Sequence, residues 1–248
     1  MINNPFSLEG KTIFITGASS GIGESISIET SKMGANVIIN GRDKERLNNT
    51  FTQLSGNCNK QIVANLAEVD SIDFLADNLP NIDGIVLCAG MIKTLPAKNI
   101  VDSAILEIFQ TNLFSSIQLI RRLLKQKKIN KGGSIVLISS ISTINAKAGN
   151  ALYSATKGAL NSYGKVLALE LASQRIRVNS IQPGFIKSRI LDGGAITHEQ
   201  MEENIKRYPL GVGKPSDIAF ACIYLLSDAA EWVTGSIFTI DGGVTLKS

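Results

Sequence analysis

Short apolar runs alternate with longer amphipathic stretches along the sequence, and this alternation limits the fold more than any other feature. The apolar runs are rich in Ile and Val; they lie at 11–16, 36–40, 61–64, 83–88, 133–139, 176–181 and 236–240. Strands of this kind are typical of a parallel sheet that is covered on both faces. Helical patterns separate them, near 20–33, 44–55, 70–78, 102–128, 151–173 and 215–227. The pattern predicts right-handed crossovers and an α/β fold.

The predicted architecture is a Rossmann-type doubly wound parallel sheet of about seven strands with helices on both faces. No linker-like, low-complexity or repeated segment interrupts the alternation, and 44% of the residues are hydrophobic, enough for a buried core. We therefore expect a single domain that spans residues 1–248. The longest irregular stretch, 183–207, exceeds an ordinary connection, and the residues at about 185–207 are predicted to form a lid over a site.

Composition argues against several classes of function. The net charge of +4 is too small to predict nucleic-acid binding, and no apolar stretch is long enough to span a membrane. Cys58, Cys88 and Cys222 are too widely spaced for a metal motif or a disulfide framework, so we expect no metal and a reducing compartment. The N-terminal residues lack the apolar core of a signal peptide, which adds to the prediction of a cytoplasmic protein.

One basic cluster lies at the end of the fourth helical pattern. As a solvated helix end it places cations favourably at a helix C-terminus, and this is the interpretation that we favour. The alternative is a docking patch for an acidic partner. The cluster consists of Arg121, Arg122, Lys125, Lys127, Lys128 and Lys131.

The first apolar run leads into TGASSGIG, residues 16–23, where glycines stand directly between a predicted strand and a predicted helix. Gly17 permits a tight turn, Gly21 lets the backbone approach a pyrophosphate, and Gly23 lets the helix pack near the sheet. The helix N-terminus then offers unpaired N–H groups and positive dipole to the phosphates. This context predicts a dinucleotide-binding turn rather than a merely flexible one. Its predicted cofactor contacts are Gly17, Ser19, Ser20, Gly21, Ile22 and Gly23.

The segment YSATK places Tyr153 and Lys157 four residues apart, on one face of a helix. An ammonium about 5 Å from a phenol, at an effective dielectric of about 20, interacts by roughly 3 kcal/mol, which lowers the phenol pKa by roughly two units. Tyr153 is therefore predicted to be a general acid–base whose pKa Lys157 lowers. An exposed surface pair is the alternative; the dinucleotide-binding turn in the same chain favours catalysis.

Taken together, these motifs resemble the short-chain dehydrogenase/reductase family. Nearly the whole chain takes part in the resemblance, through the spacing G-x-x-x-G-x-G, Ser140, the YSATK segment, Pro183 with Gly184, and TGSIFTIDGG at 234–243. The resemblance implies an oxidoreductase in which Tyr153 gives a proton to a carbonyl oxygen and Ser140 holds that oxygen. Lys157 would tune Tyr153 and bind the nicotinamide ribose.

The resemblance also supplies the other catalytic residues. Ser140 lies thirteen residues before Tyr153, the usual family spacing. Asn112, in QTNLF, matches a fourth family position, which would hold a water that links Lys157 to solvent; an Asn that merely bends its helix is the alternative. Register alone leaves three other hydroxyls open in place of Ser140, namely those of Ser139, Ser142 and Thr143.

The residues at the end of the second predicted strand indicate whether the cofactor is NAD(H) or NADP(H). NAD-binding members of the family usually carry an acidic residue where this chain has Gly41, followed by Arg42. Because a guanidinium pairs with a 2′-phosphate through two parallel hydrogen bonds, we predict NADP(H), with NAD(H) as the alternative. Asp43 either neutralises Arg42 or caps the next helix.

The resemblance extends the cofactor site beyond the glycine turn. Asn65 matches a family Asp near the adenine, and Leu66 follows it. LCAG at 87–90 replaces the family's Asn-Asn-Ala-Gly; Ala89 and Gly90 still allow close approach, but the backbone groups that the missing amides would bind need other partners. Tyr153 and Lys157 also count as cofactor contacts, and the nicotinamide side is completed by Pro183, Gly184, Ile186 and Ser188.

Within the family the chain looks most like the 3-oxoacyl-acyl-carrier-protein reductases, so the expected reaction is reduction of a 3-oxoacyl thioester to a secondary alcohol. The segment PLGVGKP departs from this subgroup because it lacks an Arg. The alternatives are a dehydrogenase for a sugar or another small secondary alcohol, and a non-catalytic dinucleotide-binding protein. Substrate identity is expected to depend on the lid and on 91–100, and the lone His198 is expected to be a surface residue.

The same resemblance implies partners. An acidic acyl carrier protein would dock on the basic cluster together with Arg175. The C-terminal strand and the two long helices would build two-fold interfaces in a homotetramer, with a homodimer as the alternative.

Overall fold

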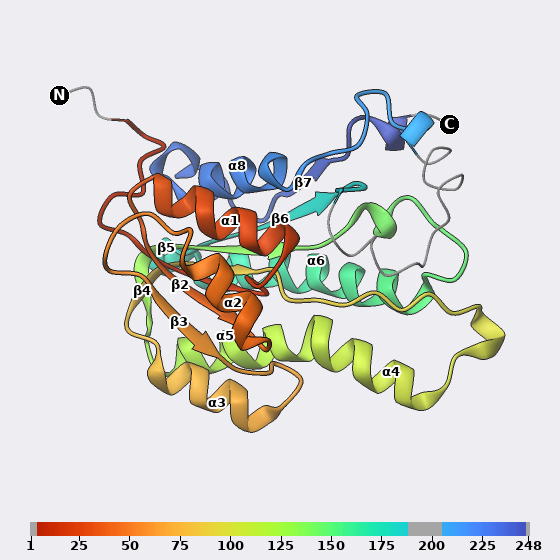
Figure 1. Ribbon diagram of the computed structural model, residues 1–248, viewed down its shortest axis with the longest axis horizontal. Helices are drawn as coiled ribbons and strands as arrows, with labels where there is room; N and C mark the ends of the chain where they lie inside the picture. Colours follow the sequence, from red (N-terminus) through yellow and green to blue (C-terminus); the bar gives the residue numbers. More distant parts are fainter. Residues whose placement is uncertain (1–3, 188–204, 247–248) are drawn as a thin grey trace.

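A parallel sheet forms the centre of the molecule in the computed structural model, which describes residues 4–187 and 205–246 (Figure 1). Its seven strands lie in the order β3-β2-β1-β4-β5-β6-β7, and every neighbouring pair is parallel. The α/β prediction is therefore confirmed. The strands are β1 (Thr12–Thr16), β2 (Asn36–Gly41), β3 (Lys60–Val63), β4 (Ile82–Leu87), β5 (Ile129–Ile138), β6 (Arg177–Pro183) and β7 (Ile237–Ile240).

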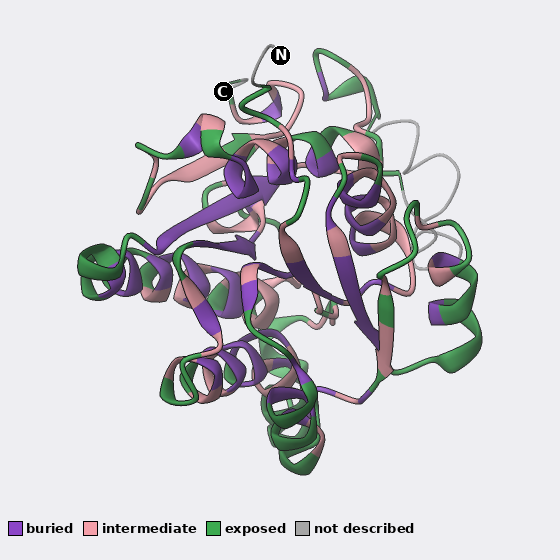
Figure 2. Cartoon of the chain, turned by 90° about the vertical axis from the view of Figure 1, so that its left-hand side faces the viewer, coloured by how far each residue is buried: buried purple, intermediate pink, exposed green. Residues whose placement is uncertain are grey.

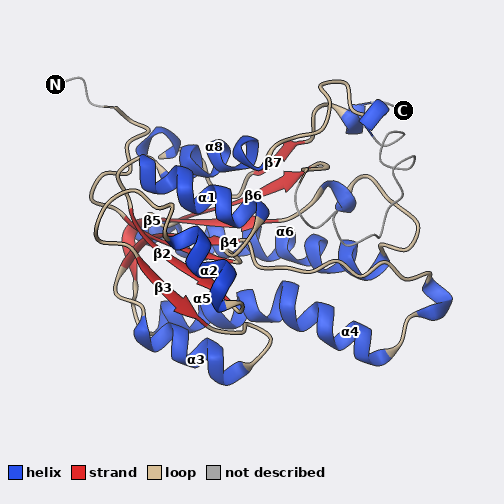
Figure 3. Ribbon diagram, viewed as in Figure 1, coloured by secondary structure: helices blue, strands red, loops and turns tan. Residues whose placement is uncertain are grey.

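Helices cover both faces of this sheet, as Figure 3 shows. They are α1 (Gly21–Lys32), α2 (Lys44–Phe51), α3 (Val69–Asn78), α4 (Asp102–Phe109), α5 (Ser115–Lys125), α6 (Ala151–Leu171) and α8 (Pro215–Leu226). Side chains alternate along each strand, so Ile13 and Ile15 of β1 pack with α1, α2 and α8, whereas Phe14 packs with α3, α5 and α6. Both faces of the sheet are consequently buried, and exposed residues lie mainly on the outer sides of the helices (Figure 2).

Two of the differences from the predicted boundaries concern the helix at 102–128 and the start of β5. The predicted helix 102–128 is interrupted by a π-helical turn, Gln110–Phe114, between α4 and α5. Such turns insert one extra residue into a helix and are frequent at functional sites. In addition, β5 begins at Ile129, four residues before the predicted start, because Ile129 pairs with Ile82 before a register shift. The glycines at 132 and 133 conceal this early start from a reading of hydrophobicity.

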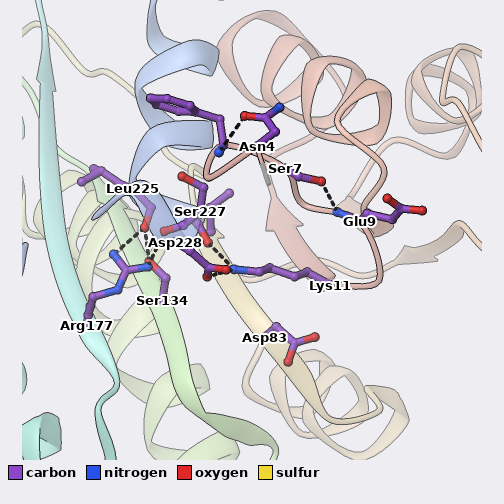
Figure 4. Close-up of polar contacts among 12 residues, drawn as sticks. Asn4, Ser7, Glu9, Lys11, Asp83, Ser134, Arg177, Leu225, Ser227 and Asp228 are labelled. Carbon is purple, nitrogen blue, oxygen red and sulfur yellow. Dashed lines mark hydrogen bonds and ion pairs between the residues drawn. The ribbon is translucent and has the colours of Figure 1, made fainter. Parts of the chain in front are cut away.

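Polar contacts anchor α8 at the edge of the sheet where the strands begin (Figure 4). Arg177, at the start of β6, is only 8% exposed. Its guanidinium donates to the carbonyls of Leu225 at 2.7 Å and Ser227 at 3.2 Å, and the Ser134 hydroxyl also donates to Leu225 at 2.7 Å. The last carbonyls of α8 have no partners within the helix, and these donors satisfy them.

The basic cluster lies at the same amino-terminal edge, and part of it binds α3. Arg122 pairs with Asp73, and Lys128 Nζ donates to the carbonyls of Ala76 at 2.7 Å and Asp77 at 2.8 Å. The ion pair with Asp73 raises the pKa of Arg122 and lowers that of the carboxyl. These two cations therefore join the end of α5 to α3.

Candidate active site

The carboxyl ends of β1, β2, β4, β5 and β6 meet at one edge of the sheet, and most of the predicted site residues lie there. Successive strands run outward from β1 in one direction and from β4 in the other. In open α/β sheets, ligands bind outside the carboxyl ends of the strands at such a switch point. The basic cluster lies at the opposite edge of the sheet, where the strands begin.

The glycine turn after β1 packs directly against the segment that follows β4. A Cβ on Gly17 would lie 2.7 Å from Ala89 Cα, and one on Gly23 would lie 2.2 Å from the Gly17 carbonyl oxygen. Gly17 and Gly21 both have positive φ, at 67° and 59°. The side chain of Ser20, the N-cap of α1, makes no capping hydrogen bond, so the first-turn N–H groups of α1 remain available to an anion. These features fit the diphosphate of a dinucleotide.

The end of β2 lies beside the glycine turn. A Cβ on Gly41 would lie 3.1 Å from Ser19 Cβ, so a longer side chain at this position would press on the turn. Arg42 is exposed, and within 4–187 and 205–246 it forms no ion pair. Asp43 caps α2 by accepting from the Arg46 N–H at 3.0 Å, so of the two roles considered for Asp43 the structure shows the cap.

The residues after β3 differ in what they can offer a ligand. Asn65 Oδ1 accepts from the Ala67 N–H at 3.2 Å, and its amide nitrogen donates to Glu68 at 2.8 Å. The carbonyl oxygen of the Asn65 side chain keeps a second lone pair for an adenine amino group. Leu66 is 7% exposed and packs in the hydrophobic core, so only its backbone could contact a cofactor. Ile22 likewise packs against the core.

Thr16 is a site residue that the sequence analysis missed. Its Oγ1 accepts from the N–H of Cys88 at 3.1 Å and from the N–H of Ala89 at 3.2 Å. The hydroxyl at the end of β1 thus supplies a partner for the backbone after β4, where the family's Asn side chains are missing. The signal was present in the sequence as the Thr of TGASSGIG, directly before Gly17.

Tyr153 and Lys157 face the same space on α6. The Lys157 Nζ lies 5.8 Å from the centre of the Tyr153 ring and donates to the Ile138 carbonyl at 2.8 Å. Burial raises the pKa of Tyr153, and a hydrogen bond with Ser140 lowers it to a smaller extent. Burial also lowers the pKa of Lys157 to about 8. In the protein chain by itself the pKa of Tyr153 is therefore raised, opposite to the direction expected from its spacing to Lys157, and desolvation of the phenol is the largest cause.

The three alternative hydroxyls have different environments. Ser139 is buried and donates to the Lys157 carbonyl at 3.0 Å. Thr143 donates to the Ser140 carbonyl at 3.1 Å, and the Ser142 hydroxyl is buried and has no partner among the described residues. Ser140 itself is the N-cap of the short 3₁₀ turn Ile141–Thr143, and its side chain lies near enough to Tyr153 to lower the pKa of the phenol. Of these hydroxyls, that of Ser140 is the one the structure brings to Tyr153.

Asn112 lies inside the π-helical turn and is fully buried. Its Oδ1 accepts from the Met91 N–H at 2.8 Å, and its Nδ2 donates to the Met91 carbonyl at 2.9 Å and the Thr156 hydroxyl at 3.2 Å. A Cβ on Gly90 would lie 3.4 Å from both Asn112 Oδ1 and Lys157 Nζ. The π turn therefore brings the Asn112 amide to the same small volume as the Lys157 ammonium.

Cys88 lies in this region as well, but it is not a nucleophile. Burial raises the pKa of its thiol to about 11, more than the nearby Lys157 lowers it. Burial also raises the pKa of Cys222, which is in the core. Both thiols therefore remain protonated.

The segment after β6 closes the other side of the site. A Cβ on Gly184 would lie 2.7 Å from Asp241 Cα, and the Phe185 N–H donates to the Tyr208 hydroxyl at 3.2 Å. Ile186 forms a bridge with Gly213. Pro183, the last residue of β6, is buried. Ser188, His198 and most of the predicted lid lie outside the described residues.

Within 4–187 and 205–246, no group of three or more His, Cys, Asp or Glu side chains is arranged to hold a metal ion. No helix in this part of the chain has both the length and the apolar character that crossing a membrane requires.

Comparisons with known proteins agree with this geometry. The family model described as enoyl-(acyl carrier protein) reductase matches residues 17–245. A 3-oxoacyl-acyl-carrier-protein reductase of Rickettsia felis is 36% identical over 240 residues, which cover 96% of this chain and 98% of the relative.

Two solved structures are similar over almost their full lengths. A putative 2-deoxy-D-gluconate 3-dehydrogenase of Agrobacterium tumefaciens, with bound NADP, is 28% identical with a TM-score of 0.85, over 99% of this chain and 100% of that one. A putative betaketoacyl-ACP reductase is 29% identical with a TM-score of 0.84, over 97% and 100% of the two chains. The matched length, the relatives and the fold thus agree, and the chain belongs to the short-chain dehydrogenase/reductase family of nicotinamide-dependent oxidoreductases.

Proposed function

We propose that this oxidoreductase uses NADPH to reduce a 3-oxoacyl thioester to the corresponding 3-hydroxyacyl thioester. The observation that carries the proposal is the convergence of Ser140, Tyr153 and Lys157 beside the glycine turn. The identity of the thioester is supported by the Rickettsia felis relative, whose name specifies a 3-oxoacyl-acyl-carrier-protein substrate.

The protein groups that would hold the cofactor follow the carboxyl edge of the sheet. The first-turn N–H groups of α1 would receive the diphosphate, and Asn65 would lie at the adenine. When bound, the cofactor supplies the hydride for reduction of the carbonyl carbon. The complete set of proposed contacts is Gly17, Ser19, Ser20, Gly21, Ile22, Gly23, Arg42, Asn65, Leu66, Ala89, Gly90, Tyr153, Lys157, Pro183, Gly184, Ile186 and Ser188.

Tyr153 would act as the proton donor. Because burial raises its pKa, the phenol keeps its proton at neutral pH, which is the state that reduction of a carbonyl requires. Ser140, whose side chain lies near Tyr153, would donate to the same substrate oxygen as charge develops on it.

Lys157 and Asn112 would support proton transfer by Tyr153 without contacting the substrate themselves. A charged Lys157 stabilises the phenolate that remains after Tyr153 gives up its proton, and its pKa of about 8 leaves it mostly charged at neutral pH. Both hydrogens of the Asn112 amide are used, but its Oδ1 has one lone pair left after the bond from Met91. That lone pair would hold a water that returns a proton toward Lys157.

The preference for NADP(H) over NAD(H) is supported by the end of β2. Gly41 provides no carboxylate for the ribose hydroxyls, and the exposed Arg42 retains its charge for a 2′-phosphate because Asp43 caps α2 instead. The solved relative from Agrobacterium tumefaciens has NADP bound.

Assembly and location complete the proposal. Large apolar side chains are exposed on α4 and α6, among them Leu106 and Leu169, at 67% and 80% exposure. These surfaces support the homotetramer, or homodimer, that the family resemblance implies. An acyl carrier protein remains the proposed carrier of the substrate. The free thiols of Cys58, Cys88 and Cys222 support a cytoplasmic location.

A second function, oxidation of a sugar or another small secondary alcohol, is supported by the similarity to the putative 2-deoxy-D-gluconate 3-dehydrogenase. Both functions use the same catalytic residues, so only the substrate distinguishes them. A non-catalytic dinucleotide-binding protein would not need Ser140, Tyr153 and Lys157 together.

The deciding experiment follows NADPH consumption by fluorescence with acetoacetyl-CoA, acetoacetyl-acyl-carrier protein and a panel of keto sugars. We expect turnover with the acetoacetyl thioesters and about 100-fold to 10,000-fold less with Tyr153→Phe, which should still bind NADPH. Tyr163→Phe, on the same helix but packed against the core, is the matched control and should keep wild-type activity. Turnover confined to keto sugars would replace the proposed substrate, and unchanged activity in Tyr153→Phe would show that the proton donor is wrong.

A further inference from the structure

A chain of side-chain hydrogen bonds connects the edge strand β7 to the turn that carries Ser140. The Thr239 hydroxyl of β7 donates to Gln182 Oε1 at 3.3 Å, and Gln182 Nε2 donates to the Thr143 hydroxyl. Thr143 in turn donates to the Ser140 carbonyl at 3.1 Å. The side chains of three residues that have no part in the catalytic scheme are thus linked by hydrogen bonds to the backbone of Ser140.

The hydrogen bonds between these side chains satisfy both ends of the Gln182 amide. Gln182 is 3% exposed, so both ends of its amide need partners inside the protein. The single proton of the Thr143 hydroxyl is used on the Ser140 carbonyl, so this hydroxyl can only accept from Gln182. The amide nitrogen therefore faces Thr143 and the amide oxygen faces Thr239.

The Ser140 side chain depends on the turn for its own position. Its Oγ accepts from the Ser142 N–H at 3.1 Å and lies near the Tyr153 phenol, whose pKa it lowers. The Ser142 hydroxyl has no partner among the described residues, so it does not help to fix the turn. Thr143 is the turn residue whose side chain ties it to the sheet.

We propose that Gln182 is a positioning residue for catalysis, and that it fixes the Ser140 hydroxyl against Tyr153 by holding Thr143. This inference rests on the proposed role of Ser140 in holding the substrate oxygen. The amide of Gln182 is not needed to pair the strands, because Gln182 and Thr239 are also neighbours in the backbone ladder between β6 and β7. Its loss should therefore affect the turn more than the sheet.

Variants of similar shape can test this. Gln182→Met and Thr143→Val each remove one polar group, their combination removes both, and Thr143→Ser keeps the hydroxyl. With NADPH and acetoacetyl-CoA, we expect kcat to fall about 10-fold to 100-fold in each single variant, with the KM for NADPH changed by less than about twofold. The double variant should be no slower than the slower single one, and Thr143→Ser should recover kcat.

Asn179→Leu is the matched control. Asn179 is a buried amide on the same strand, and it bonds to Val233 and Ser236 instead of the Ser140 turn. We expect this variant to lose thermal stability while the folded enzyme keeps its kcat. Wild-type kcat in Gln182→Met, or independent and additive losses in the double variant, would overturn the positioning role.

A measurement that needs no turnover separates this inference from the proposed function. In the wild type, the N–H groups of Ile144 and Asn145 donate to the Ile141 carbonyl at 2.9 and 2.7 Å. In Gln182→Met, their hydrogen exchange should accelerate about 5-fold to 10-fold, as expected when a bond that contributes about 1 kcal/mol is lost. If the wild type reduces no 3-oxoacyl thioester, the proposed function fails; unchanged exchange in Gln182→Met overturns the positioning of the turn whatever the substrate.

Discussion

The ammonium of Lys157 lies 5.8 Å from the centre of the Tyr153 ring and directs a hydrogen bond to the Ile138 carbonyl at 2.8 Å. Burial shifts the pKa values of the two groups in opposite directions: that of Lys157 falls to about 8, and that of Tyr153 rises. The amine therefore loses its proton before the phenol does. The basic limb of the pH profile should belong to Lys157.

The first prediction concerns that limb. Below about pH 8 both groups carry their protons; as the pH rises through about 8, Lys157 becomes neutral and no longer stabilises the phenolate. We expect kcat/KM for reduction to fall about tenfold per pH unit above this pKa. Lys157→Met should give low activity without this limb. A profile in the wild type that stays flat to about pH 10 would assign the limb elsewhere.

The second prediction concerns Thr16. Thr16→Val keeps the shape of the side chain but leaves the N–H groups of Cys88 and Ala89 without their acceptor. We expect the free energy of unfolding in urea to fall by about 1–3 kcal/mol and the Kd for NADPH to rise, because this backbone borders the glycine turn. Thr16→Ser is the control that retains the hydroxyl. Equal stability of the Val and Ser variants would contradict the anchoring role.

Sequence patterns were sufficient to predict the sheet because its central strands are buried on both faces. In β1, Ile13 and Ile15 contact one layer of helices and Phe14 contacts the other, so successive positions of the strand are apolar. The start of β5 and the π turn around Asn112 could not be predicted in this way. They depend on pairing with Ile82 and on bonds to Met91, which are far away in the sequence.

The candidate site also has features that the sequence predicts and features that it does not. The glycine spacing predicts the turn against Ala89 because a backbone contact of this kind excludes any side chain. The direction of the Tyr153 pKa shift could not be predicted, since it depends on burial and the sequence shows only the spacing to Lys157. The bonds from the Cys88 and Ala89 N–H groups to the Thr16 hydroxyl are likewise contacts between strands; the sequence contains the Thr but does not show which backbone groups it binds.

The third prediction compares two cations at the amino-terminal edge of the sheet (Figure 4). Arg177→Met should lower the free energy of unfolding by about 2 kcal/mol, because the buried carbonyls of Leu225 and Ser227 lose donors. Lys11→Met removes an ion pair with the exposed Asp228 and should cost less than about 1 kcal/mol. Both variants should keep wild-type kcat, since this edge lies opposite the active site. Equal losses of stability would show that burial of Arg177 is unimportant.

The fourth prediction tests the cofactor preference at Arg42. Arg42→Ala removes the proposed partner of the 2′-phosphate, and charge-assisted hydrogen bonds of this type contribute about 1.5–3 kcal/mol, so the Kd for NADPH should rise about 10-fold to 100-fold. The Kd for NADH should change little, because NADH has no 2′-phosphate. Arg46→Ala is the matched control: Arg46 is also exposed and lies four residues later, in the first turn of α2, but its side chain is directed to Asp43 at 3.8 Å. Fluorescence titration of both nucleotides measures the four affinities, and an equal loss for NADH and NADPH in Arg42→Ala would contradict recognition of the phosphate.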